Sequence, residues 1–237
     1  MKNFLGDRIK ENYENRSRYY LTRRTPVIVR VDGKAFHTLT AKYDKPFDAC
    51  FIQNMLDAAI LTACEVQGFK LAYVQSDEIS FLITDYDRIE TDAYFDYNKS
   101  KLESVISSYA TAYFNMNVNS SRKTNSSIAV FDGRAFNIPK EEIANYFLWR
   151  AKDWERNSIH MYLRCFYSDK EIRNKNREEQ HEMLYAKGKN WATDLAPSRK
   201  NGHFIYKEDG LIRFSDTTLP NYEDINKVVN LAISETK

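Results

Sequence analysis

The sequence has little glycine and proline and no low-complexity stretch. Its 237 residues include 7 Gly and 5 Pro, and no segment repeats with a period of 20–50 residues. A repeat or low-complexity architecture is thereby excluded. With 43% hydrophobic and 29% charged residues, the composition is that of an ordinary globular protein. The length suits one large domain, or a domain with an appendage.

The sequence also lacks a long hydrophobic run. No stretch of 18 apolar residues occurs, so no membrane span is expected, and the first twenty residues are too charged for a signal peptide. Only three cysteines are present, Cys50, Cys64 and Cys165, an odd number whose spacing fits no zinc motif. We therefore expect a cytoplasmic protein with reduced, mostly buried thiols.

The net charge of +2 does not mark a nucleic-acid binder, but the charges are unevenly distributed. Residues 1–30 hold eight Lys or Arg and three acids, whereas residues 77–103 hold eight acids and three basic residues. Such separation lets one face attract a polyanion and another attract cations, although surface scatter explains it equally well. Candidates for a phosphate-contacting patch, or for ordinary solvated charges, are Arg8, Arg16, Arg18, Arg23 and Arg24.

The apolar spacing predicts a split βαβ, or ferredoxin-like, arrangement within an α+β fold. A basic amphipathic helix is expected over 5–20 and a strand over 27–31. A helix should begin after Asp48 and end before Gly68. This helix is followed by strands at 70–75 and 79–84, a helix at 98–117 and a strand within 126–136. We expect this last strand to end in a Gly turn. The order strand, helix, strand, strand, helix, strand defines the arrangement.

The second half of the chain has a more helical pattern. Pro139 precedes a helix start, and an apolar stripe of that helix comprises Ile143, Phe147, Ala151 and Trp154. Another helix is expected at 176–187, and the remainder should contain loops and one hairpin. We therefore divide the chain into 1–139, a catalytic core with an N-terminal helix, and 140–237, a helical extension packed on the core as part of one continuous unit.

Two of the predicted strands meet acidic residues at one end. The stretch "VIVRVDGKAFH" runs into Asp32 and Gly33, and the hairpin "AYVQSDEISF" carries Asp77 and Glu78. Each pattern alone is typical of a solvated turn. In the split βαβ arrangement, however, the first and third strands are antiparallel neighbours, so the end of one lies beside the start of the other. Asp32 and Asp77 should therefore share a site at one rim of the sheet.

Two neighbouring carboxylates favour a site for a divalent cation. They repel each other and raise one another's pKa unless a cation lies between them. Oxygen ligands without His or Cys suit Mg²⁺, to which the carbonyl of Gly33 would add a ligand, and the amides of residues 34–37 would hold phosphates. Two Mg²⁺ ions would clamp the attacking and leaving oxygens of a phosphoryl or nucleotidyl transfer on a nucleoside triphosphate.

Four stretches, "VIVRVDGKAFH", "DKPFD", "AYVQSDEISF" and "FDGR", together resemble the tRNA-His guanylyltransferase family, which includes 3′-to-5′ polymerases. Other stretches, "LGDRIKENYE", "RNSI" and "KGKNW", are closer to its bacterial, archaeal and phage branch. The resemblance implies a polymerase-type palm with GTP and ATP as substrates, tRNA as partner, and a homotetramer built as a dimer of dimers. It also implies that ATP or GTP activates the tRNA 5′-phosphate before a nucleotide is added there.

The resemblance assigns roles to individual residues. It implies a catalytic set of Asp32, Asp77 and Glu78, and two Mg²⁺ ions held by Asp32, Gly33 and Asp77. Positions that match its nucleotide-binding segments are Asp32, Gly33, Lys34, Ala35, Phe36, His37, Lys45, Asp48, Ser76 and Asp77. Phe47 stands where the family has Asn, which places the polar contact of that amide in question.

The segment after Trp149 bears on the RNA substrate. The eukaryotic enzyme carries His-Ile-Asn-Asn-x-Tyr-Asn here, and only Asn157 coincides with it. That motif accompanies non-templated G addition to tRNA-His, so we expect template-dependent 5′-end repair instead. Side chains expected to contact RNA or its 5′ end are Arg30, Arg150, Arg156, Asn157, Lys187 and Asn190. Nearby Trp191 either stacks on a base or anchors the core.

Three other functions stay open. Within the family, the alternative is non-templated G addition to tRNA-His. A GGDEF-like nucleotide cyclase uses a similar palm, although this chain lacks a Gly-Gly before the hairpin acids. A non-catalytic RNA-binding module of ferredoxin-like fold should expose aromatic residues on its central strands, whereas the strands here are "VIVRV" and "ISFLI".

Overall fold

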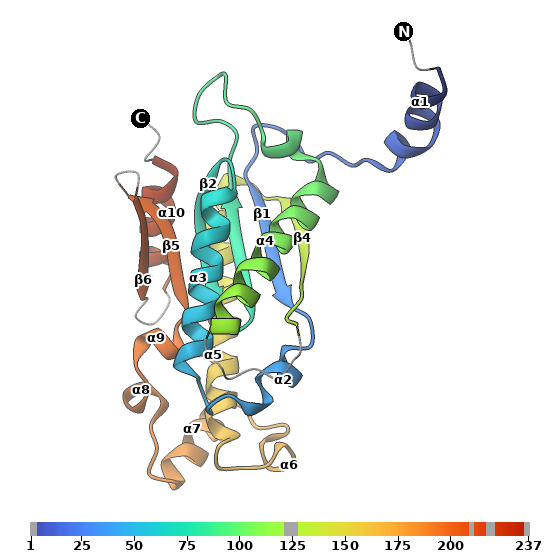
Figure 1. The fold of residues 1–237 in the computed structure, drawn as a ribbon. Helices are drawn as coiled ribbons and strands as arrows, with labels where there is room; N and C mark the ends of the chain where they lie inside the picture. Colours follow the sequence, from blue (N-terminus) through green and yellow to red (C-terminus); the bar gives the residue numbers. More distant parts are fainter. Residues whose placement is uncertain (1–3, 121–127, 209–210, 217–220, 235–237) are drawn as a thin grey trace.

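A six-stranded sheet of strand order β4-β1-β3-β2-β5-β6 forms the centre of the molecule (Figure 1). The computed structural model describes residues 4–120, 128–208, 211–216 and 221–234. The strands are β1 Val27–Gly33, β2 Phe69–Gln75, β3 Glu78–Ile83, β4 Phe131–Asn137, β5 His203–Glu208 and β6 Leu211–Asp216. All adjacent pairs are antiparallel. The first four strands have the split βαβ order, which confirms the predicted α+β, ferredoxin-like fold.

Helices cover both faces of this sheet. The α-helices are α1 Phe4–Ile9, α2 Phe36–Leu39, α3 Ala49–Glu65, α4 Lys99–Ser120, α5 Ile143–Leu163, α6 Asp169–Ile172, α7 Arg177–Ala186, α8 Trp191–Asp194, α9 Pro197–Lys200 and α10 Tyr222–Ser234. The long helices α3 and α4 lie on one face, and α5 and α10 on the other (Figure 1). None of the helices within the described residues is long and apolar enough to cross a bilayer.

The sheet is buried on both faces because successive side chains of a strand point in opposite directions. Val27, Val29 and Val31 pack under α3 and α4, whereas Ile28 packs toward α5 and α10. Every residue of β2 and β3 is buried. These strands therefore read as nearly continuous apolar runs rather than as an alternating pattern.

Helix α3 forms where the sequence predicts it. The carboxylate of Asp48 accepts a hydrogen bond of 3.0 Å from the amide of Phe51, which satisfies an amide of the first turn. Met55, Ala59 and Ala63 face the core. Gly68 follows the helix with φ 76°, a left-handed conformation that glycine adopts at little cost.

The apolar stripe of α5 is also confirmed, since Ile143, Phe147, Ala151 and Trp154 are all buried. Beyond the sheet, Trp154 joins a third apolar cluster with residues of α7 and α8. The hairpin β5–β6 extends the sheet by pairing with β2. Residues after 140 thus contribute two strands to the sheet as well as helices.

The prediction of a Gly turn at the end of the fourth strand is wrong. Asp132 and Gly133 lie inside β4, where they pair with Asp32 and Val31. A Cβ at Gly133 would lie 2.4 Å from Ser107 Oγ, so the absent side chain lets α4 pack closely over the strand. Residues 126–127 of the expected strand lie outside the described residues.

The prediction of mostly buried thiols is also wrong, because Cys50, Cys64 and Cys165 are all exposed. Cys50 and Cys64 belong to α3 but lie nine positions before and five after the buried Ala59. At 100° per residue, both point away from the stripe that contacts the sheet. Cys165 follows the end of α5.

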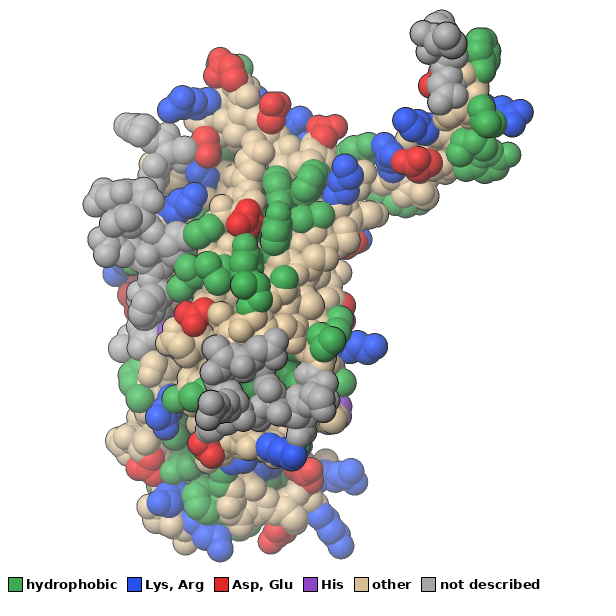
Figure 2. All heavy atoms as spheres, in the orientation of Figure 1, with side chains coloured by type: hydrophobic (Ala, Val, Ile, Leu, Met, Phe, Trp, Pro, Cys, Tyr) green, Lys and Arg blue, Asp and Glu red, His purple; other side chains and the backbone are tan. Residues whose placement is uncertain are grey.

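The N-terminal segment forms an arm that projects from the body (Figure 1). The helix expected at 5–20 is divided into α1, a π-helical segment Lys10–Glu14 and a 3₁₀ segment Asn15–Ser17, and none of these buries a residue. Figure 2 shows hydrophobic and basic side chains along it. Its most exposed apolar side chain is Phe4, at 83%.

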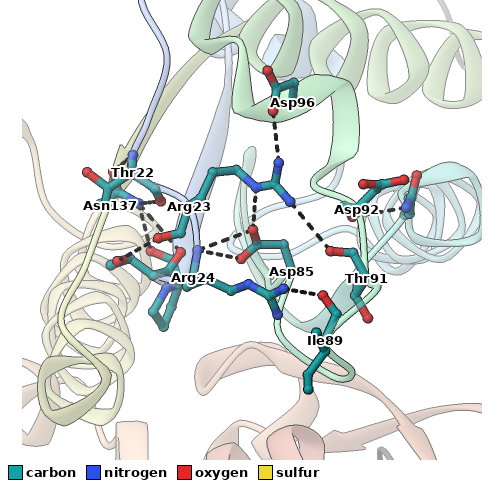
Figure 3. A network of polar contacts seen from close by, with 12 residues as sticks. Thr22, Arg23, Arg24, Asp85, Ile89, Thr91, Asp92, Asp96 and Asn137 are labelled. Carbon is teal, nitrogen blue, oxygen red and sulfur yellow. Dashed lines mark hydrogen bonds and ion pairs between the residues drawn. The ribbon is translucent and has the colours of Figure 1, made fainter.

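Polar contacts clamp the base of this arm to the body (Figure 3). The fully buried carboxylate of Asp85 accepts a hydrogen bond of 2.6 Å from Arg23 Nε and one of 2.9 Å from the backbone amide of Arg24. Arg23 also donates to the exposed Asp96 at 2.9 Å, and Asn137 pairs with the backbone of Thr22. The guanidinium of Arg24 donates to the carbonyls of Arg88 and Ile89. The side chains of Arg23 and Arg24 therefore belong to a structural clamp rather than to the candidate phosphate-contacting patch.

We predict that Asp85→Ala lowers the free energy of unfolding by about 2–3 kcal/mol, because it leaves several donors without their buried acceptor. Asp96→Ala is the matched control, since its carboxylate binds the same guanidinium from an exposed position and should matter little. Urea unfolding of both variants measures the difference. Equal losses would contradict the assignment of Asp85 as the centre of the clamp.

Candidate functional site

The end of β1 and the start of β3 lie side by side, as the topology predicts. Asp32 is the register partner of Glu78. The amide of Gly33 donates a hydrogen bond of 3.0 Å to the carbonyl of Asp77. Two segments 45 positions apart in the chain thus bring Asp32 and Asp77 to one rim of the sheet.

The turn between β2 and β3 presents Asp77 at this rim. Gln75 and Glu78 are register partners, so Ser76 and Asp77 alone form the turn. Ser76 takes a positive φ of 47°, which a two-residue hairpin commonly requires. Of the two acids, Asp77 therefore occupies the turn, where it supplies part of the site, and Glu78 begins β3.

Burial and neighbouring negative charges raise the pKa of both carboxyls. Burial, followed by the charges of Asp77, Glu78 and Asp132 and against that of Arg134, raises the pKa of Asp32 to about 6. Burial also raises the pKa of Asp77, against a hydrogen bond from Ser76. A cation between the two groups would relieve this repulsion.

The donor set fits Mg²⁺. Asp32 and Asp77 offer carboxylate oxygens, and the described residues contain no cluster of three or more His, Cys, Asp or Glu side chains arranged around one metal. Mg²⁺ prefers oxygen ligands and commonly takes one or two carboxylates together with water and substrate phosphates. Two carboxylates at a solvent-accessible rim match that preference.

Glu78 is committed to a buried ion pair. Its two carboxylate oxygens accept hydrogen bonds of 2.8 and 2.7 Å from Nε and Nη2 of Arg150, and Gln75 donates another at 3.1 Å. Arg30 approaches the same carboxylate at 3.9 Å. The ring of Trp149 lies against both guanidinium groups. Arg150 thus offsets the third negative charge of the rim, and Glu78 contacts the protein's own arginine.

Two adjoining cavities flank Asp77. The first, which we call the aromatic cavity, has a volume of about 390 Å³ and aromatic walls from Phe36, Tyr43, Phe47, Phe51 and Trp154. Its other lining residues include Gly33, Ala35, His37, Lys45, Asp48, Ser76 and Asp77. Most of the predicted nucleotide-binding positions therefore surround one space.

Gly33 and Lys34, two of the predicted nucleotide-binding positions, have structural roles as well. A Cβ at Gly33 would lie 2.3 Å from the ring of Phe36, so only glycine lets that ring pack beneath the loop. The amide of Lys34 donates 2.8 Å to the carbonyl of Val130, so it is not a phosphate donor as predicted. Phe47, in place of the polar residue expected there, packs its ring 5.8 Å from that of Trp154.

The second space, which we call the acid cavity, has a volume of about 310 Å³. Its lining includes Asp32, Gln75, Glu78, Arg150, Asn157 and His160. It shares Ser76, Asp77, Trp154, Met161 and Arg164 with the aromatic cavity. Asp77 thus borders both spaces, while Asp32 borders the acid cavity.

The candidate RNA contacts are dispersed. Arg150 and Asn157 line the acid cavity, but Arg150 is bound to Glu78. Arg156 is exposed and pairs with Asp153 outside the cavity linings. Lys187 lies over the ring of Tyr167, and the side chain of Asn190 caps α8. Neither of these two residues lines the cavities.

Trp191 anchors the core. It is buried, and its Nε1 donates a hydrogen bond of 3.0 Å to Ser158 Oγ. Of the two interpretations drawn from the sequence, base stacking is therefore excluded for this side chain in the present structure.

Sequence reasoning missed His160, Met161 and Arg164 as cavity residues. They follow Asn157 at spacings of three, four and seven residues, which is one face of a helix. Extending that face from Asn157 along α5 would have found them.

Known proteins share the sequence pattern and the fold of this chain. The family model for tRNAHis guanylyltransferase matches residues 6–139, more than half of the chain. A bacterial tRNA(His) guanylyltransferase (Thg1)-like protein, solved in complex with ATP, superposes with a TM-score of 0.90 at 37% identity and covers 97% of this chain and 99% of its own. One solved with GTP gives 0.78 at 36% identity over the same shares. The tRNA(His) guanylyltransferase of Schizosaccharomyces pombe is 29% identical over 75% of this chain and 70% of its own length.

We predict that Asp32→Asn stabilises the protein in EDTA at pH 7. Since burial and the neighbouring acids together raise the pKa of Asp32 to about 6, the folded state binds more protons than the unfolded state between about pH 4 and 6. The wild-type protein should therefore lose stability as pH rises through that window, by about 1 kcal/mol after allowance for the half-exposed position. Urea unfolding from pH 4 to 8 should show a flatter profile for the variant. A variant with the wild-type slope would contradict this electrostatic account.

We predict that Arg150→Met lowers the free energy of unfolding by about 3 kcal/mol, because Glu78 stays buried without its partner. The double variant Arg150→Met with Glu78→Gln should recover most of the loss, since no unpaired charge then remains. Thermal and urea unfolding measure both. A double variant as unstable as the single one would show that the ion pair is not the reason.

Proposed function

The chain belongs to the tRNAHis guanylyltransferase family, and from this premise we propose that it is a Mg²⁺-dependent nucleotidyltransferase that adds nucleotides in the 3′-to-5′ direction to the 5′ end of tRNA. The observation that carries the proposal is the pair Asp32 and Asp77, brought to one rim of the sheet where two cavities adjoin. Residues from separate sequence motifs thereby lie around one site, where they can take part in one reaction.

In this proposal the two carboxylates would hold two Mg²⁺ ions together with the carbonyl of Gly33. Bound there, Mg²⁺ would lower the pKa of the attacking hydroxyl and neutralise charge on the leaving phosphate. The chain's own residues bind and orient the reactants, since Asp77 borders both cavities. Arg150 neutralises the charge of Glu78 at the same rim.

The nucleotide substrates we propose are ATP and GTP, as in the names of the bacterial complexes. A volume of about 390 Å³ lies within the usual range for a ligand pocket. Phe36, Phe51 and Trp154 supply apolar walls for a base, while Lys45 and His37 lie on the same lining. The acid cavity then accommodates the reacting phosphate.

For the RNA substrate we propose template-dependent repair of a tRNA 5′ end. The segment after Trp149 differs from the eukaryotic motif, and two of its residues serve the core, because Ser158 accepts from Trp191 and Ile159 is buried. Single G addition to tRNA-His is the second candidate, favoured by the names of relatives such as the Schizosaccharomyces pombe enzyme.

We also propose the homotetramer and the division into a core, 1–139, and an extension, 140–237. The arm supports self-association, because Phe4, Leu5 and Tyr13 are exposed by 83%, 61% and 69% on helical segments that bury none of their residues. Short helices are marginal in water without a surface to pack on. Sedimentation of the full chain measures the oligomeric state directly.

A purely RNA-binding role has less support. Such a module needs exposed aromatic residues on its central strands, whereas the residues of β3 are buried and β1 is buried through most of its length. Helices cover the two faces of these strands.

We predict that Asp77→Ala lowers nucleotide transfer by on the order of 10³-fold or more, because the variant lacks the proposed metal-binding carboxylate, which borders both cavities. Asp132→Ala is the matched control: Asp132 faces Asp32 from β4 but lies outside both cavity linings, so transfer should persist. Circular dichroism should show that both variants are folded. Full activity of folded Asp77→Ala would remove the metal hypothesis.

Product lengths decide between the two RNA substrates. The wild-type protein is given full-length and 5′-truncated tRNAs with ATP, GTP and Mg²⁺. Repair predicts that truncated tRNAs are extended to the templated length, whereas single G addition predicts one extra nucleotide on tRNA-His alone. Absence of any transfer to either class would contradict the proposed function.

A further inference from the structure

A single arginine lies where the spaces of the site converge. Arg164 follows the last residue of α5 and lines both the aromatic and the acid cavity. Together with Lys45, Cys165 and Asp169, it also lines a third space of about 410 Å³, which we call the rim cavity. From the residues described, these three linings have only Met161 and Arg164 in common.

Arg150, His160 and Lys45, which also line these cavities, have different surroundings from Arg164. Arg150 is buried and bound on two atoms to Glu78. Burial lowers the pKa of His160, and the charge of Arg164 lowers it further, against the charge of Asp169. Lys45 donates to the carbonyl of Thr40 at 3.1 Å. Arg164 is thus the guanidinium with access to all three spaces.

The present partner of Arg164 is easily exchanged. Its Nε donates a hydrogen bond of 2.6 Å to Asp169, and the two side chains are 54% and 72% exposed. Ion pairs at such exposure contribute little to stability. A phosphate chain offers more negative charge and accepts two parallel hydrogen bonds from a guanidinium, so it can replace Asp169 at small cost.

We propose that Arg164 binds the polyphosphate of the nucleotide and exchanges Asp169 for it when the nucleotide enters. The base lies against the aromatic walls, and the phosphates extend past Asp77 to the junction of the cavities, where the guanidinium completes their binding. This assignment rests on the proposed function for the identity of the ligand. Arg164 is then a substrate-binding residue, and the carboxylate of Asp169 competes with the phosphates for its guanidinium.

A nucleotide fits these observations better than the RNA 5′ end does. Arg164 borders the aromatic cavity, whose lining includes Phe36, Phe51 and Trp154, as well as the acid cavity. A ligand confined to the acid cavity would contact only the residues that line that cavity. The ligand that spans both spaces must carry an apolar or aromatic part and a flexible anionic part, which is the chemistry of a nucleoside triphosphate.

Calorimetric titration with ATP at fixed Mg²⁺ tests the proposal. Arg164→Gln should weaken ATP binding by about 10-fold, a loss expected for a charge-assisted pair, and Arg164→Lys should recover part of it, since a lysine keeps the charge without the fork. Asp169→Asn removes the same ion pair yet should strengthen binding by a few fold. A structural role would make both changes weaken binding.

The matched control is Arg177→Gln, which removes an exposed arginine of α7 that is paired with Glu155 and lies outside all three linings. Its ATP affinity should equal that of the wild-type protein. Inorganic tripolyphosphate, used as a second probe, should lose affinity for Arg164→Gln to a similar extent, because the proposed contact is to the phosphates.

Steady-state kinetics separate the two ligands. Arg164→Gln should raise KM for ATP and leave KM for 5′-monophosphorylated tRNA unchanged. A rise confined to the RNA, or an unchanged ATP affinity in an active protein, would overturn the assignment while leaving the proposed function intact. A wild-type protein that neither binds ATP nor transfers nucleotides would instead overturn the proposed function.

Discussion

Close approach of Asp32 and Asp77 is the constraint on which the site depends. Antiparallel pairing of β1 and β3 places one acid at a strand end and the other in the adjoining turn. Burial and repulsion raise the pKa of both. Such an arrangement is unfavourable for an isolated protein and would become favourable once a cation shared the oxygens, which is the reason that we propose a metal site at this rim.

The remainder of the molecule supports that rim. Helices α3 and α4 fix one face of the sheet and α5 the other, while α5 carries Arg150 to Glu78 and places Asn157, His160 and Arg164 beside the cavities. The C-terminal half therefore takes part in building the site, although its residues lie beyond the segment matched by the family model.

The sequence predicted those features that local pattern and topology determine. The acid-bearing strand ends followed from the order of the elements, and the start of α3 followed from Asp48. Asp132-Gly133 was mistaken for a turn because the reason for Gly133, the closeness of α4, is a tertiary contact. The partner of Glu78 lies 72 positions away, so no local pattern could identify it. Arg164 had a helical spacing to Asn157, a signal that was present but unused.

The most direct test of the account is a crystal structure of the wild-type protein with ATP and Mn²⁺, an ion that scatters X-rays anomalously and prefers the same oxygen ligands as Mg²⁺. The account predicts anomalous peaks bonded to carboxylate oxygens of both Asp32 and Asp77 and to the phosphates. Peaks that lie elsewhere, or that touch only one of the two acids, would contradict it.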